Sequence, residues 1–180
     1  MKTKAHVGKP EVPEFLNVLQ EGHREILDHL DKLLMLAAEA PSAKPTDESR
    51  AQAREIIAFF SGPAREHNYD EERHVFPVLR TCEDGEVRRV AERLCEEHGW
   101  IELYWLEIEP QLAAIAAGMA LDDAGDLRAG ADLFAATTRD HVRLEESLLY
   151  PELRGRLKPA ELKAFKLEMA ARRAGGAARG

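Results

Sequence analysis

Histidine and glutamate recur in this chain at a spacing that places both on one face of a helix. His67 is followed four residues later by Glu71, and His141 is followed four residues later by Glu145. Residues four apart on an α-helix are turned by about 40° and rise by about 6 Å, so each pair points in one direction. Both pairs lie on stripes that are otherwise apolar, which predicts that they face the core. Burying a charged carboxylate without a partner costs several kcal/mol, and a bound metal ion removes that cost.

The two pairs belong to an internal repeat. Segments 67–77 and 141–151 both contain His, three residues, Glu-Glu, three residues, an aromatic residue and Pro, with an offset of 74 residues (141 − 67). Two further histidines, His23 and His98, precede these segments and are 75 residues apart (98 − 23). We therefore interpret the chain as two similar helical hairpins, each contributing a lone histidine and a His-Glu pair.

Four imidazoles and two carboxylates without a thiolate are a ligand set that suits iron, manganese or zinc. A carboxylate can bridge two ions whereas an imidazole binds one, so the set predicts a dinuclear site. Glu102 lies four residues after His98, and this single spacing leaves open whether it is a ligand or lies outside the ligand set. The candidate metal ligands are His23, His67, Glu71, His98, Glu102, His141 and Glu145.

Other histidines lie close to this pattern without repeating it. His74 returns to the stripe of His67 after seven residues, but its counterpart in the repeat is Leu148, which favours core packing over ligation. His29 is turned by about 120° from His23 and is expected at the surface or boundary. His6 lies in the N-terminal arm.

The glutamates that follow the two candidate ligands, Glu72 and Glu146, are turned by about 100° from them. We expect both side chains to face solvent or to pair with arginines. Cys95 lies three residues before His98 and is expected to be a buried structural thiol.

The composition indicates one soluble helical domain. The chain has 180 residues, of which 44% are hydrophobic and 32% charged, and its formal net charge is −8. This acidic balance argues against partners such as nucleic acid or an anionic membrane. Cys82 and Cys95 are the only cysteines, and the first residues contain no long apolar run. These features favour a reducing compartment and predict a cytoplasmic location.

The periodicity of apolar residues predicts an all-α fold, an up-down-up-down four-helix bundle with a short extra helix at its C-terminal end. We expect an extended N-terminal arm at 1–13, the bundle at 14–155, and a short helix with a flexible tail at 156–180, where Gly175 and Gly176 should stop any helix. The expected bundle helices span about 14–40, 46–80 with a kink or brief break at Gly62 and Pro63, 86–117 and 126–150.

Over about residues 14–155 the chain resembles the hemerythrin-like domain, also called the HHE cation-binding domain. The resemblance rests on His23, His67/Glu71 with Phe76-Pro77, His98, and His141/Glu145 with Tyr150-Pro151. It implies two non-haem iron ions with bridging carboxylates and an oxo or hydroxo bridge, although zinc or manganese is also compatible with the ligands.

Members of this family bind oxygen, sense oxygen, nitric oxide or iron, or help to repair damaged iron centres. The oxygen carriers place two histidines four apart on the third helix, and here the second of these positions is Glu102, which argues against reversible oxygen transport. We expect a protein that binds or senses a small diatomic ligand (O2 or NO) or iron, rather than a dedicated enzyme. The alternative is a redox-active protein acting in peroxide removal or iron-centre repair. A metal-free interaction module is disfavoured by the buried charges, and the sequence identifies no protein partner.

Overall fold

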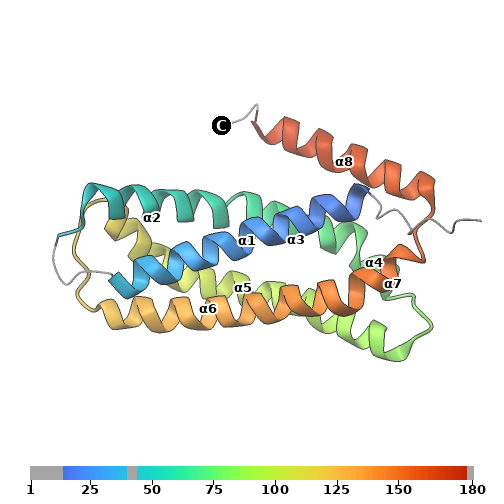
Figure 1. Cartoon of the computed structure of the whole chain (residues 1–180), viewed down its shortest axis with the longest axis horizontal. Helices are drawn as coiled ribbons and strands as arrows, with labels where there is room; N and C mark the ends of the chain where they lie inside the picture. The colour runs from blue at the N-terminus through green and yellow to red at the C-terminus, as the bar shows by residue number, and fades with distance from the viewer. Residues whose placement is uncertain (1–13, 40–43, 178–180) are drawn as a thin grey trace, which may run out of the picture.

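In the computed structural model, which describes residues 14–39 and 44–177, every regular element is a helix (Figure 1). The all-α class predicted from the sequence is confirmed for these residues. The elements are α1 (Glu14–Glu39), α2 (Asp47–Phe60), α3 (Pro63–His74), α4 (Phe76–Leu79), α5 (Gly85–Ala116), α6 (Ala124–Leu144), the π-helix η1 (Glu145–Leu149), α7 (Tyr150–Arg154) and α8 (Pro159–Ala177).

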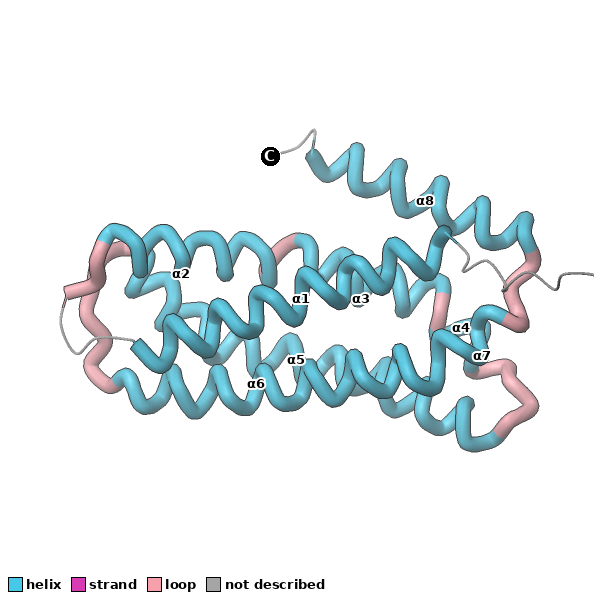
Figure 2. Tube along the Cα trace, in the orientation of Figure 1, coloured by secondary structure: helices cyan, strands magenta, loops and turns pink. Residues whose placement is uncertain are grey.

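Four long helices, α1, α2, α5 and α6, lie along the long axis of the molecule (Figures 1 and 2). α2 packs against α1 and α5, and α6 packs against the same two helices. Each of the four therefore turns one face to a shared interior. Among the described residues, no helix combines the length and the apolar character that crossing a membrane would require.

Side-chain caps fix where three of the helices begin. The Thr46 hydroxyl accepts a hydrogen bond from Ser49 N at 3.1 Å and caps α2. Asp84 caps α5, and Asp123 caps α6. Each cap satisfies backbone N–H groups that the first helical turn leaves without a partner.

The predicted second helix is broken at Gly62 and Pro63, which is one of the two outcomes expected there. α2 ends at Phe60, and α3 begins at Pro63 after a two-residue turn. Proline is tolerated at the first position of a helix, where its missing N–H would have no partner in any case. The break therefore falls at the predicted Gly62-Pro63 pair and starts a new helix just before His67.

Both repeated segments lose regular α-helical geometry shortly after the ligand pair. α3 ends at His74, and the π-helix η1 begins at Glu145, whose carbonyl accepts from Tyr150 N five residues later. Pro77 and Pro151 explain the parallel, because proline lacks an N–H and its ring clashes with the carbonyl four residues earlier. The aromatic-Pro ending of the repeat thus interrupts the α-helix in both segments.

The interior consists of two apolar clusters with a polar layer between them. One cluster fills the part of the bundle formed by α2, most of α5, α6 and the second half of α1, and includes Leu30, Ile56, Trp105 and Phe134. The other lies at the end formed by α4, α7 and the start of α1 and α5, and includes Leu16, Phe76, Leu94 and Tyr150. Polar groups in the intervening layer are therefore shielded from water on both sides.

The C-terminal helix departs from the prediction. α8 continues through Gly175 and Gly176 to Ala177, so the expectation that these glycines stop the helix is wrong. α8 lies outside the bundle at the end where α1 begins (Figure 1), and its buried Met169 joins the second apolar cluster. The predicted arm at 1–13 and His6 lie outside the described residues.

Candidate metal centre

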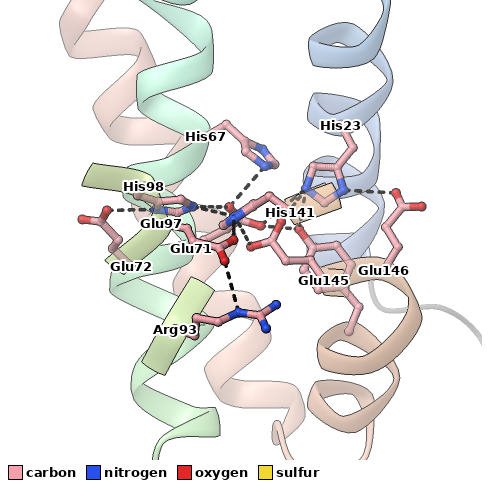
Figure 3. Close-up of polar contacts among 11 residues, drawn as sticks. His23, His67, Glu71, Glu72, Arg93, Glu97, His98, His141, Glu145 and Glu146 are labelled. Carbon is pink, nitrogen blue, oxygen red and sulfur yellow. Dashed lines mark hydrogen bonds and ion pairs between the residues drawn. The ribbon is translucent and has the colours of Figure 1, made fainter. Parts of the chain in front are cut away.

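Six of the seven candidate ligands meet in the polar layer, and each is at most 5% exposed. They come from four sides of the bundle, as Figure 3 shows: His23 from α1, His67 and Glu71 from α3, His98 from α5, His141 from α6, and Glu145 from the first residue of η1. Two groups have ligand atoms within 4.8 Å of one another, namely Glu71, His98, His141, Glu145 and His23, His67, Glu71.

The two glutamates lie between the histidine pairs. Glu71 directs Oε2 towards Nε2 of His67 at 3.3 Å and of His98 at 3.6 Å, while its Oε1 lies 3.6 Å from Nε2 of His23. Glu145 directs Oε1 towards His141 at 3.1 Å and Oε2 towards His23 at 3.2 Å. Each carboxylate therefore faces histidines of both hairpins, which is the placement required of a bridge.

Several polar atoms in this layer have no hydrogen-bond partner among the described residues. They are both ring nitrogens of His67, Oε2 of Glu71 and both carboxylate oxygens of Glu145. Leaving such groups unsatisfied in a buried layer is costly. Imidazole nitrogens and carboxylate oxygens are donors that iron, manganese and zinc accept, so the residues fit a metal centre.

The buried histidines and carboxylates of this layer shift one another's pKa values and so favour protonated histidines beside ionised carboxylates. Burial opposes the charge on His23, but the neighbouring carboxylates of Glu145, Glu146 and Glu71 outweigh burial and raise its pKa to about 11. Burial likewise opposes the charge on His141, whose pKa is nevertheless raised to about 10 by Glu145 and Glu97. Burial acts against ionisation of Glu71 too, yet the neighbouring histidines hold its pKa well below the usual range.

Three partly exposed glutamates each contact one of the buried histidines. His98 Nδ1 donates to Glu72 at 2.9 Å, His23 Nδ1 donates to Glu146 at 3.1 Å, and His141 Nδ1 donates to Glu97 at 3.3 Å (Figure 3). Such contacts leave Nε2 of each ring directed at the interior.

The expectation that Glu72 and Glu146 face solvent or pair with arginines is thus wrong as to their partners. Each carboxylate is about two-fifths exposed, but it bonds a histidine of the opposite hairpin. The duplicated Glu-Glu could have indicated this role. Glu97 was missed because nothing in the local sequence connects it with His141, which is 44 residues away.

Tyr150 also belongs to the centre and was predicted only as part of the aromatic-Pro ending. Its hydroxyl donates to Glu71 Oε1 at 2.5 Å, and its ring stacks on His23 with centroids 5.3 Å apart. Burial and the neighbouring Glu71 and Glu145 raise the pKa of this phenol well above its usual value, so it remains a donor.

The structure does not bring Glu102 to the cluster. Its side chain is 40% exposed and forms a bidentate ion pair with Arg65, whose Nε lies 3.1 Å from Glu102 Oε2. His74 is buried between Phe15 and Phe165, which confirms the packing role expected for it. His29 lies at the boundary, stacked on Phe59.

A small cavity of about 30 Å³ adjoins the cluster. A cavity needs roughly 10–15 Å³ to hold one water molecule, so this one can take a ligand of very few atoms. Apart from His23, His67, Glu71, His141 and Glu145, its walls are mainly apolar: Ile26, Phe60, Ala64, Asn68, Ile101, Phe134, Thr138 and Val142.

Comparison with known families gives a match over most of the chain. A family model described as the hemerythrin HHE cation binding domain matches residues 14–153. This range contains all seven candidate ligands and both copies of the repeat. A search of curated proteins gives no match.

Proposed function

Because the chain belongs to the hemerythrin HHE cation-binding family, we propose that it holds two iron ions and binds a small diatomic ligand, dioxygen or nitric oxide, beside them. His23 and His67 would hold one ion, and His98 and His141 the other. The four helices that carry them would form an up-down-up-down bundle in the cytoplasm.

Glu71 and Glu145 would bridge the two ions. Each carboxylate has oxygens directed at histidines of both pairs, and three of these four oxygens have no hydrogen-bond partner among the described residues. Bound iron would supply a redox-active centre with a coordination position for an external ligand. Zinc or manganese is compatible with the same donors.

The cavity beside the cluster carries the proposal for a diatomic ligand. Its volume of about 30 Å³ favours a small guest, and the walls beyond the candidate ligands, such as Phe60, Ile101 and Phe134, favour an uncharged one. Thr138 also lines the cavity, but its hydroxyl proton is used in a hydrogen bond to the carbonyl of Phe134 at 2.8 Å and is not directed at a guest. A neutral molecule of two atoms is the guest that this space accommodates best.

The test is to load the protein with Fe2+ under anaerobic conditions and to titrate it with nitric oxide, following visible absorption and electron paramagnetic resonance. Ala64→Leu should fill the cavity and weaken nitric oxide binding at least about tenfold while iron loading is retained. Ala51→Leu, on an exposed position of α2, is the matched control. Equal binding by the wild type and Ala64→Leu, or no binding by the iron-loaded wild type, would contradict the proposal. Rapid peroxide consumption without stable ligand binding would support the redox alternative.

A further inference from the structure

The two halves of the metal centre are related by the internal repeat. α1 with α2–α4 forms one hairpin, and α5 with α6 to α7 forms the other. The ring centroids of His23 and His67 are 4.7 Å apart, and those of His98 and His141 are also 4.7 Å apart. Each hairpin therefore contributes one histidine pair with the same spacing.

The repeated segments reach across to the opposite hairpin in equivalent ways. Glu72 of the first hairpin accepts from His98 of the second, and Glu146 of the second accepts from His23 of the first. Phe76 also contacts His98, edge-on with centroids 5.4 Å apart, whereas Tyr150 stacks on His23 with centroids 5.3 Å apart. Each lone histidine is thus contacted by a glutamate and an aromatic ring of the opposite hairpin.

This symmetry is broken at the residue before each lone histidine. Glu97 precedes His98, and the 75-residue offset makes Gly22 its counterpart (97 − 75). Glu97 accepts from His141 Nδ1 and is itself held by Arg93 at 3.1 Å (Figure 3). At Gly22 there is no side chain, and a Cβ would lie 2.5 Å from Nδ1 of His67. His67 therefore packs on the backbone of α1, and neither ring nitrogen has a hydrogen-bond partner within the described residues.

A second departure from the repeat symmetry also affects the His23/His67 side of the centre. Tyr150 stands where the first repeat has Phe76, so only one copy of the repeat brings a hydroxyl. That hydroxyl donates to Glu71 Oε1, the oxygen nearer His23, and lies 3.3 Å from His23 Nε2. The hydrogen bond draws electron density from the carboxylate oxygen that would serve the His23/His67 position.

We infer that the two metal positions are unequal, with the His98/His141 position binding its ion more tightly and filling first. Glu97 is the positioning residue that creates the difference, because a hydrogen-bonded outer carboxylate fixes the ring and raises its basicity. Loss of such a partner typically lowers metal affinity about 10–100-fold. The inference rests on the proposed dinuclear centre. In such a centre the ion at the His98/His141 position would be retained, and the ion at the His23/His67 position would exchange.

A titration of the metal-free protein with Co2+ alone, followed by visible absorption and calorimetry, tests this. Two binding steps should appear, separated by at least about tenfold in affinity. His67→Ala should remove the weaker step and keep the stronger one. Tyr150→Phe should strengthen the weaker step and leave the stronger one in place.

Two matched glutamate variants are expected to weaken different binding steps. Glu97→Gln should weaken the first binding step about tenfold and reduce the difference in affinity between the two steps. Glu146→Gln should weaken the second step and increase that difference. Two steps of equal affinity, or weakening of the second step by Glu97→Gln, would overturn the inference while leaving the dinuclear centre intact. Failure to bind two ions at all would contradict the dinuclear centre and the inference with it.

Discussion

Loading the metal-free protein with divalent metal at neutral pH should release two protons per chain. A histidine must be deprotonated to bind a metal ion. In the metal-free fold, surrounding carboxylates outweigh burial and raise the pKa of His23 to about 11 and that of His141 to about 10. Both rings are therefore protonated at pH 7. By mass action, displacing two protons makes the overall binding constant for two ions rise about 100-fold per pH unit from pH 7 towards pH 9.

The proton count can be measured by calorimetry of Co2+ binding in buffers with different enthalpies of ionisation. The dependence of the observed heat on the buffer enthalpy gives the number of protons released. His74→Gln is a suitable control, because burial lowers the pKa of His74 and leaves it neutral at pH 7. Heats that do not depend on the buffer would refute this account of how the cluster is stabilised without metal.

The same shifts set the pH dependence of stability. Both histidines have a folded-state pKa above the ordinary value of 6.5, so their contribution to the metal-free fold is fully present below about pH 6.5. It is lost as pH rises towards 10–11. Metal binding strengthens over the same range, so the difference in Tm between loaded and chelated protein should widen from pH 7 to pH 9. A constant difference would count against proton–metal exchange at these rings.

Three further variants separate ligands from supporting residues. Glu71→Ala or Glu145→Ala should leave at most one ion per chain by metal analysis, because each carboxylate faces both histidine pairs. Glu102→Ala should retain both ions and change stability by only about 0.2–1 kcal/mol, since its ion pair with Arg65 is exposed; loss of an ion would return Glu102 to the ligand set. Trp105→Ala should cost about 3–5 kcal/mol in urea unfolding with metal stoichiometry unchanged, because this side chain is buried in the apolar cluster away from the ligands.

The helices and the inner residues of the site follow from short-range patterns. The spacing of four between His67 and Glu71, repeated at His141, needs only helical geometry to place both groups on one face. The break at Gly62 and Pro63 follows from proline chemistry in the same local way.

Contacts between helices could not be predicted from residue spacing. Whether Glu102 reaches the centre depends on the rotation of α5 in the bundle, and the structure turns it towards Arg65 instead. Glu97 on α5 reaches His141 on the next helix, α6, 44 residues away in the sequence. The contact of α8 with α1, where the buried Met169 joins an apolar cluster, likewise depends on tertiary packing and not on local propensity.

The most direct test of the central claim is metal analysis of protein purified without oxygen, combined with its visible spectrum before and after exposure to air. The account predicts two irons per chain and new charge-transfer bands on oxidation, lost together in Glu71→Ala. A chain that folds with less than one metal ion, or that holds zinc and shows no visible spectrum in air, would contradict a redox-active di-iron centre.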